Sequence, residues 1–184
     1  MNWTTIILAI IVIILIIVLY IYFVSKSSTI KQSASLKGTN PAITTLNSGQ
    51  STRYAYAIWV YVDAWNTTSQ KTIFYRNNNI RVYLDSVKPI LNCDITLMDS
   101  NQAQTISITD NFPIQAWTCI IISADNNVID SYIDGKLVNS VKLKGYPQTP
   151  GDASKDPVVL GSGWDAYVSG FQNWSTPIGP EQAW

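Results

Sequence analysis

The chain has 184 residues, with 12 basic and 12 acidic side chains, seven tryptophans and no histidine. Without histidine there is no Ser-His or Cys-His nucleophile pair and no imidazole metal ligand, and the single glutamate, Glu181, leaves only aspartates for a paired-carboxylate mechanism. The basic residues form no cluster, so the sequence predicts no nucleic-acid partner.

The first 24 residues predict a transmembrane helix. An unbroken apolar run covers residues 6–24, and at about 1.5 Å per residue it extends about 28 Å, close to the ~30 Å hydrocarbon core of a bilayer. A cleaved signal peptide is the alternative, but the run is longer than a signal-peptide core and lacks a basic segment before it. We therefore expect residues 3–24 to contact the lipid bilayer.

Aromatic and basic residues flank this run. The residues that we assign to the anchor are Trp3, Ile6, Tyr20, Tyr22 and Lys26. Because the nearby lysines all follow the run, the positive-inside rule predicts a single-pass protein whose C-terminal domain lies on the cytosolic side. Two glycosylation sequons, at Asn66 and Asn173, would act only on a domain in the lumen, and we give them less weight.

Residues 25–49 are polar, rich in Ser and Thr, and interrupted by Asn-Pro and Ser-Gly pairs that break regular structure. This composition predicts a flexible tether, which as a coil would reach roughly 25 to 30 Å. The folded domain would then stand away from the bilayer or lie along a partner.

From residue 50 onward the chain shows short segments of alternating β-branched and aromatic residues, separated by Asn, Asp, Gly and Pro. The expected strands cover residues 53–63, 71–76, 79–84, 90–98, 104–109, 116–125, 128–134, 136–143, 157–162 and 167–174. No helical period appears among them, so residues 50–184 predict an all-β antiparallel sandwich.

The Asp134-Gly135 pair lies between two of these strands. Asp and Gly both tolerate the positive φ angles of a type I′ turn, which is the usual turn of a two-residue hairpin. A hairpin therefore explains the pair better than a ligand or catalytic acid at Asp134.

Four motifs, in order, resemble the laminin-G-like (pentraxin-like) jelly-roll branch of the concanavalin A-like lectin/glucanase superfamily. They are "YAIWVYV" around Trp59, "AWTCIIISAD" around Trp117, the hairpin "VIDSYIDGKLV", and the closing segment from "VVLGSG" through Trp174. The resemblance implies an antiparallel jelly-roll over residues 50–184, with these three tryptophans in its core. It carries little information on function, because one fold hosts many functions.

The glucanases of this superfamily carry a Glu-x-Asp-x-Glu strand, and no such strand occurs here. Since retaining hydrolysis needs two carboxyl groups about 5 Å apart, we expect no catalytic residue and no enzymatic activity. Calcium-binding relatives gather Asp and Asn in loops, and the comparable segments here are 63–66, 76–79, 124–127 and 151–156. We interpret them as solvated turns and assign no metal site or cofactor, leaving calcium as an open alternative.

A binding surface is expected where aromatic side chains lie in loops or at strand ends, because Trp and Tyr serve both sugar stacking and protein contacts. The candidate binding residues are Trp65, Tyr146, Trp164 and Asp165. Cys93 and Cys119 each alternate with apolar neighbours and are expected to point into the sandwich. Buried thiols are favoured there, while a disulfide stays an alternative.

Two functional hypotheses follow. The first is a non-catalytic, membrane-anchored structural module that links a bilayer to neighbouring proteins, such as a minor capsid or inner-membrane protein of a large double-stranded DNA virus. In that case the domain would face the capsid. The second is a membrane-anchored lectin that binds glycans, with or without calcium.

Overall fold

The computed structural model describes Trp3 and residues 11–18, 28–29, 33–46 and 51–183. Residues 11–18 are helical, and their apolar side chains are exposed. Within the described ranges, none of the helices has both the length and the apolar character needed to cross a bilayer. The other anchor residues that the sequence predicts, Ile6, Tyr20, Tyr22 and Lys26, lie outside the described residues.

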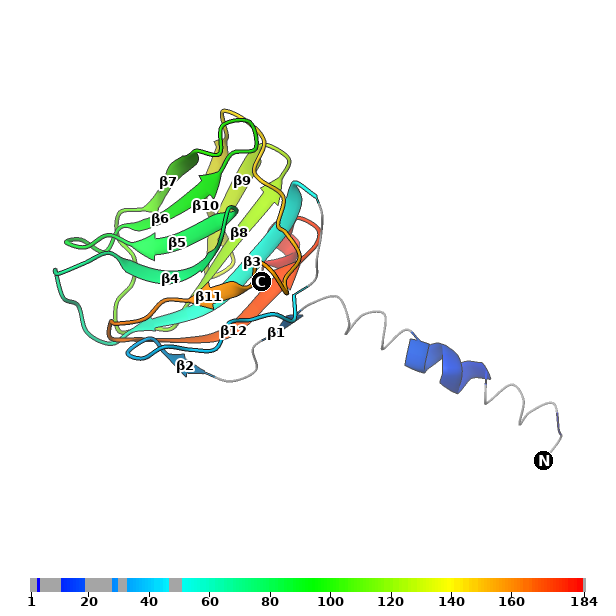
Figure 1. Cartoon of the computed structure of the whole chain (residues 1–184). Coiled ribbons are helices and arrows are strands. Elements are labelled where there is room, and N and C mark those ends of the chain that lie inside the picture. The colour runs from blue at the N-terminus through cyan, green and yellow to red at the C-terminus, as the bar shows by residue number, and fades with distance from the viewer. Residues whose placement is uncertain (1–2, 4–10, 19–27, 30–32, 47–50, 184) are drawn as a thin grey trace.

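In the described residues, twelve strands form two stacked antiparallel sheets (Figure 1), which confirms the prediction of an all-β sandwich. The strands are β1 (Ser28–Thr29), β2 (Ala34–Ser35), β3 (Arg53–Val62), β4 (Lys71–Arg76), β5 (Ile80–Leu84), β6 (Leu91–Thr96), β7 (Ala103–Thr109), β8 (Thr118–Asp125), β9 (Val128–Ile133), β10 (Lys136–Lys142), β11 (Val158–Leu160) and β12 (Ala166–Trp174). Every strand expected from residue 50 onward is present, within a few residues of its predicted ends.

The larger sheet has the order β1-β12-β3-β8-β9-β10, with β2 also paired to β12, and the smaller sheet has the order β11-β4-β5-β6-β7. One end of the sandwich is where β3 begins and β8 ends, since Arg53 lies opposite Asp125. We call it the proximal end. The distal end is where β3 finishes and β8 begins, with Val60 opposite Thr118.

The core lies between the two sheets and follows the two-residue alternation of the strands. In β3, Tyr54, Tyr56 and Ile58 point inward and are almost fully buried. The alternate residues Trp59 and Tyr61 lie on the outer face, and Trp59 is 43% exposed. The expectation of a buried Trp59 is therefore wrong, because both sets of alternate residues on this strand are apolar and the tyrosines occupy the core.

The same alternation corrects two predictions for β8. Cys119 lies opposite Trp59 and is half-buried on the outer face, and Trp117, just before the strand, is 45% exposed. Cys93 does point into the core. Both cysteines are free thiols, and their places on opposite sides of the larger sheet rule out a bond between them in this fold. Trp174 is half-buried beneath the C-terminal segment.

The described part of residues 25–49 does not behave as a free tether. β1 and β2 both pair with β12, and Leu36 is fully buried, with its N–H donating to the Ala166 carbonyl. Ile43 forms a bridge with Val158 at the edge of the smaller sheet. Because this segment satisfies edge backbone groups and buries Leu36, it belongs to the sandwich, and the tether prediction is corrected accordingly.

A buried polar network closes the proximal end. The Arg76 guanidinium is 1% exposed and donates to the Tyr56 hydroxyl at 3.0 Å, the Gly151 carbonyl at 2.6 Å and the Asp156 carbonyl at 2.9 Å. Asn79 binds Tyr54 and the Gln148 carbonyl in the same layer. These bonds fix the 148–156 loop, because each buried donor has an acceptor there.

Candidate functional site

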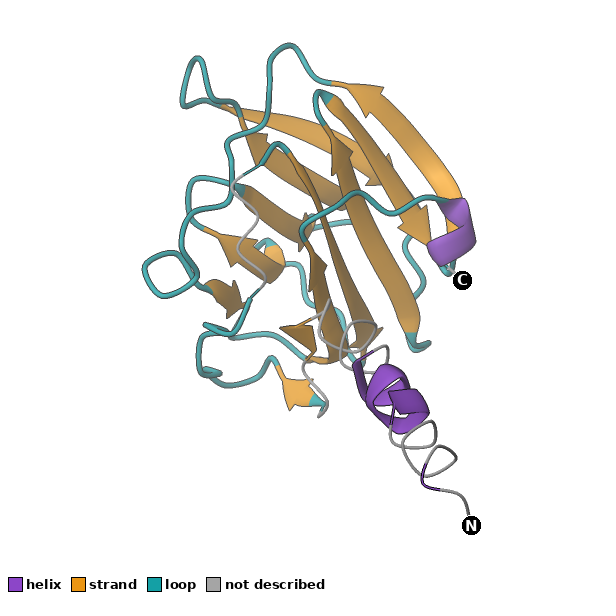
Figure 2. Ribbon diagram, turned by 90° about the vertical axis from the view of Figure 1, so that its right-hand side faces the viewer, coloured by secondary structure: helices purple, strands orange, loops and turns teal. Residues whose placement is uncertain are grey.

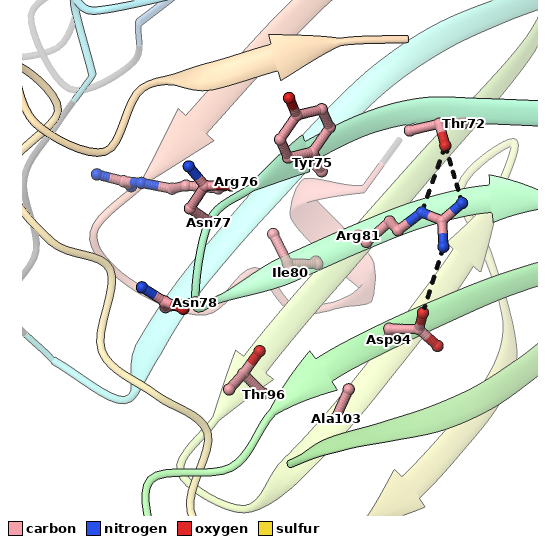
Figure 3. A pocket seen from close by; sticks show the side chains of 10 residues that line it. All are labelled: Thr72, Tyr75, Arg76, Asn77, Asn78, Ile80, Arg81, Asp94, Thr96 and Ala103. Atoms are coloured by element: carbon pink, nitrogen blue, oxygen red, sulfur yellow. Dashed lines mark hydrogen bonds and ion pairs between the residues drawn. The ribbon is translucent and has the colours of Figure 1, made fainter. Parts of the chain in front are cut away.

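The outer face of the smaller sheet carries a polar groove of about 390 Å³. Its wall consists of side chains from β4 to β7, and Figure 3 shows how they lie. The lining residues are Thr72, Tyr75, Arg76, Asn77, Asn78, Ile80, Arg81, Asp94, Thr96 and Ala103. Sequence reasoning did not identify this groove, although the alternation of IRVYL in β5 does place Arg81 on the outer face, opposite Asp94.

Arg81 and Asp94 are the charged pair of the groove. Arg81 donates to the Thr72 hydroxyl at 3.3 and 3.1 Å, and its guanidinium lies 4.0 Å from Asp94 (Figure 3). The same guanidinium lies 4.4 Å from the centre of the Tyr83 ring. The Thr105 hydroxyl donates to Asp94 at 2.7 Å. Burial, followed by the charge of Asp94, raises the pKa of Tyr83. The pair is therefore held in place yet open enough to bind a polar ligand.

The groove does not supply the groups that a glycosidase needs. Asp94 is the one carboxylate among the described residues that line it, whereas both retaining and inverting mechanisms use two. A polar ligand in this groove could accept hydrogen bonds from Arg81 and donate one to Asp94, next to the ring of Tyr75.

A second surface lies on the outer face of the larger sheet, toward the distal end. Trp59, Tyr61 and Trp117 form it, and we call it the tryptophan surface. The rings of Tyr61 and Trp117 pack at 5.6 Å between centroids. Trp59 and Trp117 line a hollow of about 390 Å³ together with Cys119, Asp134, Gly135 and Ala183.

The C-terminal segment covers one part of the outer face of the larger sheet. Ile178 and Ala183 cover the small side chains of Ala55 and Ala57 on the proximal half of this face, and the short helix Pro180–Gln182 lies beside the sheet (Figure 2). Ala183, the last residue of this segment that the structure describes, lines the hollow. On the distal half of the face, Trp59 and Trp117 are exposed among the described residues.

A glycine supports the ring of Trp59 from below. Gly170 lies in a bulge of β12, where the register with β3 shifts, and has a φ of 58°. A Cβ at this position would stand 3.0 Å from Cδ1 of Trp59. The missing side chain therefore allows the indole to lie on the β12 backbone while its other face stays accessible.

The four predicted binding residues do not form one site. Tyr146 is 53% exposed at the proximal end. Trp65 is half-buried against the core, with the Lys71 ammonium 4.3 Å from its ring, and burial lowers the pKa of Lys71. Asp165 binds Lys37 at 2.9 Å. Tyr146, Trp65 and Asp165 are all at least partly exposed, and their role in binding stays a prediction.

Trp164 has a structural position. It is 5% exposed in the core, and its indole N–H donates to the Thr72 carbonyl at 2.8 Å. Gly161 permits this approach, since a Cβ there would stand 1.7 Å from the same carbonyl oxygen. Trp164 lies in the loop before β12, as predicted, but its indole fills the core next to β4 and is not available to a binding partner.

The Asp- and Asn-rich loops serve the fold itself. Asp125 forms an ion pair with Arg53 at 2.8 Å. The Asp152 carboxylate accepts hydrogen bonds from the Ser154 backbone N–H and from the Ser154 hydroxyl, and these two bonds lower the pKa of Asp152. Asn79 belongs to the buried network described above. Within the described part of the chain, no three Cys, Asp or Glu side chains gather where they could share a metal ion.

The family model described as the concanavalin A-like lectin/glucanases superfamily matches residues 36–182. A curated ACT domain-containing protein of Lacticaseibacillus casei is 22% identical over 122 residues, which covers 66% of this chain and 81% of that protein. That identity is too low to indicate a shared family.

Three solved structures show the same fold. The binding domain of botulinum neurotoxin serotype G has a TM-score of 0.61 and 12% identity, over 85% of this chain and 44% of that chain. The serotype D ligand-binding domain in complex with N-acetylneuraminic acid gives 0.61 and 12%, over 84% and 42%. The DC binding domain in complex with rat synaptotagmin II gives 0.61 and 13%, over 86% and 45%. This chain spans less than half the length of each.

Proposed function

Because this chain belongs to the concanavalin A-like lectin/glucanases superfamily, we propose that it is a non-catalytic binding module held on a membrane by residues 1–24. Its sandwich attaches the bilayer to neighbouring proteins of a larger assembly. The proposal agrees with the polar groove, which has one lining carboxylate in the described part of the chain.

The tryptophan surface carries the proposal. Two indoles with 43% and 45% of their area exposed line one hollow, next to the part of the sheet face that the C-terminal segment covers. Tryptophan and tyrosine are the residues that most often dominate binding energy at protein interfaces. A partner that filled the hollow would remove both rings from water, which is a favourable process.

The membrane part of the proposal rests on the apolar run of residues 6–24, whose length fits a bilayer. Lysines after the run favour a cytosolic or capsid-facing domain. A single span followed by a binding sandwich suits a protein that ties an internal membrane to a protein shell, and a minor capsid or inner-membrane protein of a virion is the assembly that we favour.

The test places a photo-crosslinking amino acid at Trp117 in the full chain within its native membrane or particle. We expect a protein adduct from Trp117 and none from a matched probe at Val87, which is 61% exposed between β5 and β6 of the smaller sheet. Equal labelling from both positions, or lipid adducts alone, would remove the tryptophan surface as the docking site.

Carbonate extraction tests the anchor separately, since an integral chain stays in the membrane pellet.

A glycan-binding lectin is the second candidate, and the groove of Arg81 and Asp94 favours it. A guanidinium, a carboxylate and an aromatic ring are the groups that hold sugars, and the cation suits an acidic sugar. The serotype D neighbour was solved with N-acetylneuraminic acid. Titration with sialylated glycans, with and without calcium, should show binding that Arg81→Ala abolishes and Leu137→Ala preserves, if this function holds.

A further inference from the structure

The structure limits how far the sandwich can stand from the bilayer. β1 begins at Ser28, where it pairs with Asn173 of β12, and the apolar run ends at Val24. Three residues separate the two. Even fully extended, at about 3.5 Å per residue, the chain from Val24 to Ser28 covers at most about 14 Å. This is half the reach expected for a free tether over residues 25–49.

The pairing of β1 also determines which end of the sandwich meets the membrane. β1 runs antiparallel to β12, with Ser28 opposite Asn173 and Thr29 opposite Gln172. The chain therefore approaches from the side where β12 finishes, near Trp174, which lies opposite Ala55 at the start of β3. That side is the proximal end.

The proximal end exposes a group of apolar and charged side chains, in which two lysines outnumber the neighbouring Asp99. Tyr146 is 53% exposed and Met98 is 44% exposed, and the Met98 N–H donates to the Tyr146 carbonyl at 2.9 Å. Lys142, the last residue of β10, and Lys144, in the loop that follows it, are both exposed. We call these four residues the proximal rim. An isolated bridge between Leu97 and Pro147 holds its two loops together.

We propose that the proximal rim rests on the bilayer surface, so that the sandwich is docked on the lipid headgroups and not suspended above them. The inference rests on the proposed anchor. Tyrosine is enriched at membrane interfaces because its ring is apolar and its hydroxyl is polar, and the flexible thioether of Met98 adapts to irregular apolar surroundings. The two lysines supply cations for lipid phosphates. The short connection holds the β1 edge of the proximal end near the headgroup layer. The rim lies at the same end but beside the opposite edge strand, β10, so its own side chains complete the docking.

Docking at the proximal end has a consequence for the tryptophan surface. Trp117 precedes β8 and Asp134-Gly135 joins β9 to β10, both at the distal end. The hollow between them therefore faces away from the bilayer. The same anchoring that brings Tyr146 to the lipid presents the tryptophans to a partner on the far side.

The test uses the full chain in liposomes that contain anionic lipid and headgroup spin-labelled lipid. A fluorophore is attached to Tyr146→Cys in a Cys119→Ser background, while Cys93 stays buried and unlabelled. The matched control carries the fluorophore at Leu137→Cys, an equally exposed position that lies beside the distal hairpin. We expect headgroup quenching at residue 146 to exceed that at residue 137 by at least threefold.

Flotation of the same liposomes separates this inference from the proposed function. If the chain floats with the liposomes and both fluorophores are quenched alike, the anchor stands and docking of the rim is overturned, leaving the rim free for a protein. If the chain does not float, the anchor fails and the inference fails with it. Stronger quenching at residue 146 in floated chains supports both.

Discussion

The Asp134 carboxylate accepts a hydrogen bond from the Cys119 backbone N–H at 2.8 Å, and the Asp134 N–H donates to the Cys119 carbonyl at 2.9 Å. The two bonds attach the β9–β10 hairpin to the start of β8. Asp134 and Gly135 have φ angles of 48° and 75°, as the predicted type I′ turn requires. Asp134 is thus a structural residue of the turn that also borders the tryptophan surface.

We expect Asp134→Ala to lower the free energy of unfolding by about 1–2 kcal/mol, because it removes the bond to Cys119 and places alanine at a positive φ. Asp134→Asn should cost less than half as much, since an amide oxygen can accept the same bond and asparagine tolerates this conformation. Denaturant unfolding of the chain in detergent measures both. Equal losses would show that the side-chain bond contributes nothing.

Gly170 and Gly163 form a matched pair for the support of Trp59. Both have positive φ angles, 58° and 82°, but a Cβ at Gly163 would have no neighbour within 4 Å. Alanine at either position should cost about 1 kcal/mol for the backbone conformation. Gly170→Ala should cost more and change the tryptophan fluorescence, because the indole of Trp59 must move. An unchanged spectrum would contradict the contact.

Arg76 is buried and Arg81 is partly exposed, so replacing each should change the free energy of unfolding by a different amount. Arg76→Met leaves the Tyr56 hydroxyl and two carbonyls without their donor inside the protein, and we expect a loss of at least about 3 kcal/mol. Arg81→Met removes an exposed guanidinium and should change the free energy of unfolding by less than about 1 kcal/mol. Similar losses in denaturant unfolding would refute the buried network.

The Cys119 thiol should make stability depend on pH in the alkaline range. Burial, followed by the charge of Asp134, raises the pKa of Cys119 from 9.0 to about 11. Because the folded chain then holds this proton more tightly than the unfolded chain does, the thiol's contribution is complete below pH 9 and is lost as the pH rises through 11.

The measurement compares unfolding midpoints at about pH 8 and about pH 10.5 for the natural chain and for Cys119→Ser. Buried Tyr54 and Tyr56, whose pKa values burial also raises, contribute equally to both. The natural chain should therefore lose more stability than the variant. Identical losses would place the Cys119 thiol in water.

The strands were predictable because polar turn residues separate short runs of β-branched and aromatic residues. Which residues of each strand point into the core was not predictable in the same way. In β3, the residues at 54, 56 and 58 and those at 55, 57 and 59 are both apolar, so alternation alone could not decide between them. Trp59 and Cys119 were assigned to the wrong face for this reason.

Contacts between distant segments were also beyond a single sequence. Leu36 docks beside Ala166, and the Trp164 indole reaches Thr72 across 92 positions of the chain. The groove requires Arg81 and Asp94 from neighbouring strands, a pairing that follows from register and not from spacing. The tryptophan surface was missed because the resemblance implied buried rings at those positions.

The N-terminal segment, which pairs with β12 and forms a bridge with Val158, also protects strand edges from pairing with a neighbouring copy of the chain. Unpaired strand edges are templates on which a neighbouring copy can add a strand and start an aggregate. On one side of this sandwich the chain occupies those positions itself, through β1, β2 and Ile43. On the other side β10 carries Lys136, Lys142 and a bulge between Leu137 and Asn139, which discourage such addition. A neighbouring copy therefore finds few free positions at the edges of the larger sheet on which to add a strand and begin a fibre.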